Sequence, residues 1–297
     1  MTATTPHAGR DLTVTGRWAR ALAGWELELQ AADRPATTRY LRGYHLRRLA
    51  DDFPDRDPWS ITRTELVDWL AGWSWSRETR RSYRSSLRSF YGWGQAAGHI
   101  AVSPAATLPP ITPERGLPRP VPSDRLGAAV AAADPRVRLA LLLLAETGIR
   151  RAELAAAHTD DLLQDCNGWS LRVMGKGRHE RRVPVGDSLG QLLTLIPRGW
   201  VFPTYHRGDT RGAPRGHLSP AHLGKLISAA LGDGWTAHTV RHRFGTLAYA
   251  VERDLRAVQE LLGHQKIETT TVYTKVPDGA MRRAAAASSI ITTPALV

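Results

Sequence analysis

Prolines divide this chain of 297 residues into two parts. Six of them fall within sixteen residues, at Pro109, Pro110, Pro113, Pro118, Pro120 and Pro122. Because proline lacks a backbone N–H and holds φ near −65°, such a segment can continue neither a helix nor a central strand. We therefore interpret residues 107–122 as a semi-extended linker between two domains.

The part before the linker has a helical pattern. Residues 1–10 are small and polar, and we expect them to form a flexible N-terminus. Between residues 11 and 106, apolar side chains recur near the spacing of helices, and either Thr62 or Thr64 is suited to cap one of them. The sequence predicts a helical domain over residues 11–106.

One predicted helix of this domain, over residues 76–93, carries a basic stripe. Five arginines fall at helical spacing on one face, and apolar residues such as Tyr83 and Leu87 fall on another. These arginines are Arg77, Arg80, Arg81, Arg84 and Arg88. The chain has a formal net charge of +12 and a pI of about 10.6, which favours a polyanionic partner. We predict that the stripe contacts DNA phosphates; a solvated charged face is the alternative.

The part after the linker, residues 123–285, mixes helices with one hairpin. Residues 169–174 alternate as a strand does, Gly175-Lys176-Gly177 forms a turn, and residues 182–185 return as the partner strand. The remaining pattern is helical, over 123–132, 137–145, 153–157, 188–195, 220–231, 239–251 and 255–262, with Gly263 ending the last of these. The predicted fold class is mainly α with a small antiparallel sheet (α+β).

Other features of the sequence bound its location. Cys166 is the only cysteine, so no disulfide can form within the chain, and a reducing compartment fits. The first ten residues lack a signal-peptide core, and the longest apolar run, residues 139–145, is too short to span a bilayer. We expect a soluble, intracellular protein with no membrane partner.

A set of polar residues in the second half carries the chemistry. It comprises Arg150 with Glu153, Lys176 at the hairpin tip, His238 with Arg241 and His242, His264 after Gly263, and Tyr273. Each has a simple structural alternative, such as an ion pair within one helix for Arg150 and Glu153. The set holds no carboxylate cluster of the metal-ligand type and no serine or cysteine triad. It does combine two arginines, a lysine, histidines and a potential tyrosine nucleophile.

In order and spacing, this set resembles that of the tyrosine recombinase (phage integrase) family. The resemblance implies the catalytic residues Arg150, Lys176, His238, Arg241, His264 and the nucleophile Tyr273, supported by Glu153 and His242. It spans roughly residues 11–285. The N-terminal part then resembles the SAM-like core-binding domain of these enzymes, residues 123–285 their catalytic domain, and residues 286–297 a tail that docks on a neighbouring subunit.

The residue types suit this chemistry. A covalent phosphoenzyme conserves the energy of the DNA phosphodiester bond, and a phenol can form it if its proton leaves during the attack. Arg150 and Arg241 can hold the phosphate oxygens, on which charge develops, with no metal or other cofactor. The resemblance implies that Lys176 protonates the leaving 5′-oxygen. The product is a 3′-phosphotyrosine, and a free 5′-hydroxyl can reverse the attack without ATP.

The resemblance implies three kinds of partner: double-stranded DNA at attachment or recombination core sites, further copies of the chain in a homo-tetramer on two sites, and an accessory directionality factor. It also implies a place in the cytoplasm of a bacterial host, associated with the nucleoid when bound to DNA. The Arg151-Ala152 pair and the polar segment 203–219 depart from the motifs of Xer recombinases. They favour integration and excision of a phage (viral) genome or another mobile element. The alternatives are an Xer-like resolvase of chromosome dimers, a type IB topoisomerase and a non-catalytic DNA-binding protein.

Overall fold

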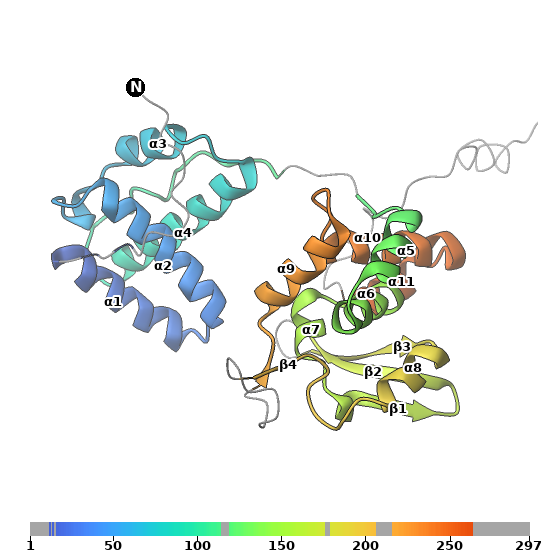
Figure 1. Cartoon of the computed structure of the whole chain (residues 1–297). Coiled ribbons are helices and arrows are strands. Elements are labelled where there is room, and N and C mark those ends of the chain that lie inside the picture. Colours follow the sequence, from blue (N-terminus) through green and yellow to red (C-terminus); the bar gives the residue numbers. More distant parts are fainter. Residues whose placement is uncertain are drawn as a thin grey trace, which may run out of the picture. The chain divides into compact units, whose positions relative to one another are not determined.

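The computed structural model describes residues 12, 14, 16–113, 119–175, 179–205 and 216–263. The chain divides into two compact units, residues 1–116 and 117–297, shown with their elements in Figure 1. The described part is mainly helical with small antiparallel sheets, which confirms the predicted fold class. The roles of the two units as core-binding and catalytic domains, and their exact bounds, stay predictions.

The first unit is built from helices alone in its described part. They are α1 (Gly16–Ala31), α2 (Ala36–Asp52), the 3-10 turn η1 (Pro58–Ser60), α3 (Arg63–Ala71) and α4 (Arg77–Ala96). Thr62 caps α3: its hydroxyl accepts from the backbone N–H of Glu65, whose carboxylate accepts from the backbone N–H of Thr62. This reciprocal pair satisfies two of the N–H groups that a helix start leaves without intrahelical acceptors.

Aromatic side chains form the core of the first unit. Phe90 of α4 is fully buried, with Trp18 and Trp59 stacked on it and Trp25 packed edge-on. Gly94, one turn further along α4, lies under Trp59: a Cβ atom there would come within 2.3 Å of the indole ring. Close approach of Trp59 to the helix backbone therefore requires glycine at position 94.

The second unit combines helices with two small antiparallel sheets. Its elements are α5 (Ser123–Ala132), α6 (Pro135–Thr147), α7 (Arg151–Ala155), η2 (Thr159–Asp161), β1 (Leu162–Asp165), β2 (Gly168–Met174), β3 (Glu180–Val185), α8 (Asp187–Thr194), β4 (Pro203–Thr204), β5 (Gly216–His217), α9 (Pro220–Leu231), α10 (Ala237–Glu252) and α11 (Leu255–Leu262). Strands β1, β2 and β3 form one antiparallel sheet in sequence order, and β4 pairs with β5. In Figure 1, α8 lies against the three-stranded sheet.

Helix α6 is the centre of this unit. Ala140, Leu141, Leu143 and Leu144 are completely buried, in one core with α5, α9, α10 and the inward side chains of β2 and β3. Asp134 caps its start, accepting from the backbone N–H groups of Arg136 and Val137. This packing holds α6 in place, and the candidate site lies at the C-terminal end of α6.

The sheet extends beyond the two strands predicted. The predicted β2–β3 pairing is present, but β3 starts at Glu180 rather than at residue 182, and β1 pairs with β2 over four residues. Strands β1, β4 and β5 are too short to produce a readable alternation of apolar and polar residues.

Among the described helices, none is long and apolar enough to cross a membrane.

We predict opposite effects on stability for two substitutions in α4. Gly94→Ala should lower the free energy of unfolding by about 1–3 kcal/mol, because the new methyl group overlaps Trp59. Gly92→Ala should raise it by about 0.5–1 kcal/mol, because nothing lies within 4 Å of a Cβ there and alanine favours the helix. Urea unfolding monitored by tryptophan fluorescence measures both; equal effects would contradict the packing of Trp59 on Gly94.

Candidate active site

The site begins where α6 ends. Gly148 follows α6 with φ of 59°, in the left-handed region that favours glycine. A Cβ atom at this position would also come within 2.2 Å of the Phe244 ring of α10. The next residue, Ile149, is completely buried, and Arg150 is the N-cap of α7.

Glu153 binds both the backbone N–H and the side chain of Arg150. Its carboxylate accepts from the Arg150 backbone N–H at 2.7 Å and from the Arg150 guanidinium at 2.8 Å. The same carboxylate receives a two-pronged contact from Arg181 of β3, with both N–O distances at 2.8 Å. Only 3% of the Glu153 side chain is exposed, so this carboxylate has exchanged water for four protein donors.

The electrostatics of this group follow from those contacts. Burial alone would raise the pKa of the Glu153 carboxyl, but hydrogen bonds and charge from Arg181 and Arg150 lower it to about 2. Glu153 is therefore ionised at neutral pH, between two guanidinium groups.

Arg241 comes from the first half of α10 and is almost fully buried. Its guanidinium donates to the carbonyl of Gly148 and to the carbonyl of Leu262, both at 2.6 Å. Arg241 thus joins the turn after α6 to the end of α11. The predicted site residues Arg150 and Arg241, 91 positions apart in the sequence, meet at this point.

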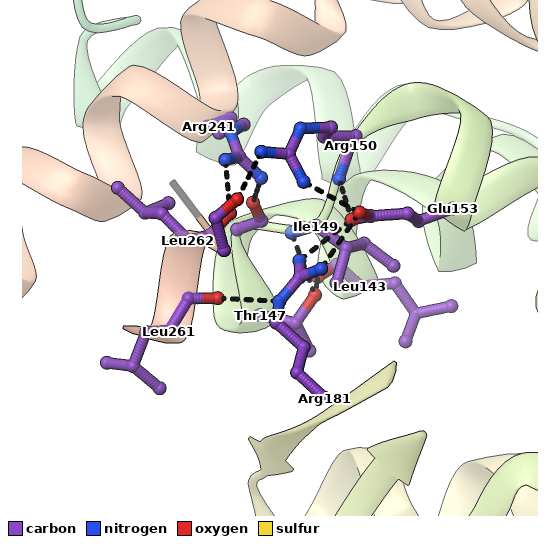
Figure 2. Close-up of polar contacts among 11 residues, drawn as sticks. Leu143, Thr147, Ile149, Arg150, Glu153, Arg181, Arg241, Leu261 and Leu262 are labelled. Atoms are coloured by element: carbon purple, nitrogen blue, oxygen red, sulfur yellow. Dashed lines mark hydrogen bonds and ion pairs between the residues drawn. The ribbon is translucent and has the colours of Figure 1, made fainter. Parts of the chain in front are cut away.

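Three consecutive carbonyls at the end of α11 each accept from a different arginine. Arg181 donates to Leu261, Arg241 to Leu262, and Arg150 to Gly263. Figure 2 shows the three guanidinium groups converging on this helix end and on Glu153. The last carbonyls of a helix lack intrahelical donors and carry partial negative charge, which explains why cations gather there. Gly263 ends α11 in the left-handed conformation, as predicted.

His238 and His242 lie beside this group on α10. Their rings pack edge to face, with centroids 4.2 Å apart. Desolvation and the charge of Arg241 lower the pKa of His238, and burial, His238 and Arg241 lower the pKa of His242 to about 4. Both imidazoles are therefore neutral at pH 7, so each can donate one hydrogen bond and accept another.

The structure brings part of the predicted set together. Arg150, Glu153 and Arg241 converge. His238 and His242 lie near enough to Arg241 for its charge to lower their pKa values. The predicted residues Lys176, His264 and Tyr273, together with the tail 286–297, lie outside the described residues. The simple structural alternative for Arg150, an ion pair with Glu153 within α7 and its N-cap, is present in the structure. A role of Arg150 in binding phosphate therefore has to be compatible with this ion pair.

Sequence reasoning missed Arg181, although a signal was present. Along β3, Arg181 lies two residues before Val183 and four before Val185, both buried. The period of two in a strand places all three on one face. A charged residue on the buried face of a strand indicates a buried partner, and here that partner is Glu153.

Three of the five arginines of the predicted stripe on α4 have partners within the first unit. Arg84 donates two hydrogen bonds to the carbonyl of Leu108, Arg80 donates to the carbonyl of Trp75, and Arg81 pairs with Glu78. Arg77 and Arg88 are exposed. Contact of this stripe with DNA stays a prediction. Arg84 in addition holds the chain segment at Leu108 against α4.

A second polar surface lies between α2 and α4. The hollow there is lined by Thr37, Thr38, Leu41 and Arg42 of α2 with Ser82, Ser85 and Ser86 of α4. The Arg42 guanidinium donates to the hydroxyl of Ser89 at 2.7 Å. Hydroxyl groups next to a guanidinium can bind phosphate oxygens or base edges, so this hollow is a further candidate for nucleic-acid contact.

Among the described residues, no three His, Cys, Asp or Glu side chains are placed to hold a metal ion.

Comparison with known proteins identifies the class. A sequence profile described as the phage integrase family matches residues 123–279. Tyrosine recombinase XerC of Neisseria meningitidis is 32% identical over 250 residues, which cover 78% of this chain and 81% of the relative. XerC of a Mycobacterium species is 32% identical over 255 residues, covering 77% and 83% of the two chains.

The fold agrees with this match. A solved lambda integrase dimer bound to a COC′ core site aligns with a TM-score of 0.68 at 20% identity, over 86% of this chain and 76% of that one. At that identity the alignment shows a shared fold alone. The chain belongs to the phage integrase family of tyrosine recombinases, enzymes that cleave and rejoin DNA, which confirms the resemblance found in the sequence.

Glu153→Gln should remove a pH-dependent part of the stability. The pKa of Glu153 is lowered from 4.5 to about 2 on folding, which corresponds to roughly 3 kcal/mol of stability. Because the folded-state pKa is the lower one, this contribution is complete above pH 4.5 and is lost as the pH falls toward 2. The free-energy difference between wild type and variant, from urea unfolding at pH 7 to 3, should therefore shrink with falling pH.

Glu260→Gln is the control for that measurement. Glu260 pairs with Arg256 on the exposed side of α11, and such surface pairs contribute about 0–1 kcal/mol. Its substitution should change stability little at any pH. A difference between wild type and Glu153→Gln that stays constant down to pH 3 would contradict the proposed state of Glu153.

Proposed function

We propose that this recombinase acts at specific DNA sites and cleaves one strand at a time by attack of Tyr273 on a phosphodiester. The observation that carries the proposal is the convergence of Arg150 and Arg241 on adjacent carbonyls at the end of α11, immediately before His264. Two guanidinium groups at one point form a site for an anion with several oxygens, which a phosphodiester provides.

The reaction needs positive charge that is already in place. Attack on phosphorus adds charge to the non-bridging oxygens, and donors fixed before the reaction stabilise that charge without reorganisation. Arg241 is held by two carbonyls and Arg150 by Glu153 and Gly263, so both guanidinium groups are oriented by the protein itself. Arginine has five N–H donors, and donors of Arg150 beyond these two contacts can serve the phosphate.

The remaining roles follow the family resemblance. Tyr273 is the nucleophile, Lys176 is the general acid for the leaving 5′-oxygen, and His238 and His264 donate hydrogen bonds to the phosphate. His238, being neutral at pH 7, is also able to take the proton of the attacking phenol. Glu153 orients Arg150, and His242 supports His238 through the contact of their rings.

Double-stranded DNA is the proposed partner. A lambda integrase tetramer has been solved bound to a Holliday junction, and XerH has been solved bound to its difH substrate. We propose the same partner and a homo-tetrameric assembly on two sites for this chain, with residues 286–297 docking between subunits and an accessory factor setting directionality. The net charge of +12 supports binding to a polyanion.

Two biological roles use this chemistry. Integration and excision of a phage or mobile element is favoured by the departures from Xer motifs at Arg151-Ala152 and residues 203–219. Resolution of chromosome dimers is favoured by relatives named XerC, which match more than three quarters of this chain. We propose a mobile-element integrase as the first candidate and an Xer-like resolvase as the second.

The covalent step is tested with Tyr273→Phe. Wild-type protein incubated with a nicked suicide duplex should form an adduct that survives denaturing electrophoresis, and Tyr273→Phe should form none. Arg150→Ala and Arg241→Ala should slow adduct formation on the order of 10²–10³-fold, the cost of losing a preorganised donor. An adduct with Tyr273→Phe, or none with wild type, would refute the mechanism.

Recombination assays on two plasmids should separate the two roles. One plasmid carries directly repeated chromosomal dimer-resolution sites of the host, and the other carries the two attachment sites that flank the candidate element. An integrase should recombine the second plasmid at least about tenfold faster, since each mismatched base pair in a site costs about 1–3 kcal/mol of binding. Preference for the first plasmid would support the Xer-like role. Relaxation of a supercoiled plasmid lacking both sites would indicate a topoisomerase.

A further inference from the structure

We propose that Arg181 is a positioning residue for strand cleavage: it occupies the Glu153 carboxylate, so that Arg150 keeps its charge and its donors for the DNA phosphate. The inference rests on the catalytic role proposed for Arg150. Arg181 itself need not touch the DNA, because it acts through Glu153 and the end of α11.

The way in which the carboxylate is shared carries this inference. Both terminal nitrogens of Arg181 face Glu153, one to each oxygen at 2.8 Å, which is the two-pronged geometry that arginine prefers with a carboxylate. The Arg150 side chain reaches only Oε1, with one nitrogen, and turns its other terminal nitrogen to the Gly263 carbonyl. Without Arg181, the buried carboxylate would be free to take Arg150 in the two-pronged mode.

The charge count points the same way. Arg150, Arg181 and ionised Glu153 together carry one net positive charge, whereas Arg150 and Glu153 alone carry none. Arg181 and Glu153 are largely buried, so water screens this difference in charge less than it would at a fully exposed surface. Loss of Arg181 should therefore weaken the stabilisation of the transition state, even though Arg150 is still present.

Arg181 also supports the helix end that precedes His264. Its Nε donates to the Leu261 carbonyl at 3.2 Å, and a Cβ atom at Gly263 would come within 3.0 Å of the Arg181 guanidinium. The guanidinium thus packs directly against the Gly263 turn, whose carbonyl receives Arg150. One side chain of β3 consequently links the β2–β3 hairpin, Glu153 of α7 and the end of α11.

The test compares Arg181→Met with Arg182→Met. Arg182 is the next residue of β3, points to the opposite face and is exposed, so it controls for loss of one charge from this strand. With protein saturating a suicide duplex, Arg181→Met should slow the first-order rate of adduct formation on the order of 10²-fold. DNA affinity should stay within about twofold, because many phosphate contacts share it. Arg182→Met should match wild type in both measurements.

A second variant separates positioning from mere structural support. Adding Glu153→Gln to Arg181→Met removes the carboxylate that would capture Arg150 and restores the net positive charge. The double variant should therefore cleave at least about fivefold faster than Arg181→Met, whereas a residue that only stabilises the fold would give a further loss. If Arg181→Met fails to fold by circular dichroism, Arg181→Lys, which offers one donor point instead of two, replaces it with the same expected rescue.

The outcomes distinguish this inference from the proposed function. Normal cleavage by Arg181→Met, or a double variant no faster than the single one, would overturn the inference while Tyr273 chemistry stands. Wild-type protein that forms no adduct, or Arg150→Ala that cleaves normally, would overturn the proposed function and this inference with it.

Discussion

The ionised carboxylate of Glu153 is the interaction on which the second unit depends. A buried charge without partners costs several kcal/mol, and Glu153 avoids this cost because four N–H donors from Arg150 and Arg181 surround it. Those donors lie on different elements, so satisfying one carboxylate fixes the start of α7 against β3. The arginines then bind the end of α11, which is thereby joined to the same point.

Backbone carbonyls complete the arrangement. Three guanidinium groups close together repel one another, and one carboxylate balances only one of them. The carbonyl groups at the end of α11 and at Gly148 supply the remaining negative partial charge without neutralising the site. A site built in this way keeps a net positive charge. Such a charge stabilises the negative charge that develops on a phosphodiester during nucleophilic attack. Burial is the main reason why the pKa values of His238 and His242 are lowered, and the positive charge of Arg241 lowers them further.

The first unit has a different kind of core, and its predicted arginine stripe lies on α4. Its core is rich in aromatic side chains, and Trp18, Trp25 and Trp59 pack on Phe90 of α4. Some arginines of α4 are used to hold neighbouring chain, as Arg84 holds the carbonyl of Leu108. An arginine stripe in a sequence therefore overstates the number of cations that are available to a partner.

The sequence by itself determined the family, the fold class and the end of α11 at Gly263, because residue type, order and spacing carry that information. It also predicted Arg150 and Arg241 as site residues, and the structure brings these two side chains together. It also contained the inward position of Arg181 on β3, since strand alternation is local. Only the tertiary structure decided which groups share Glu153 and that three consecutive carbonyls bind three arginines. Those contacts join residues up to 113 positions apart, and such distances depend on how α6, α10 and β3 pack, which no local pattern encodes.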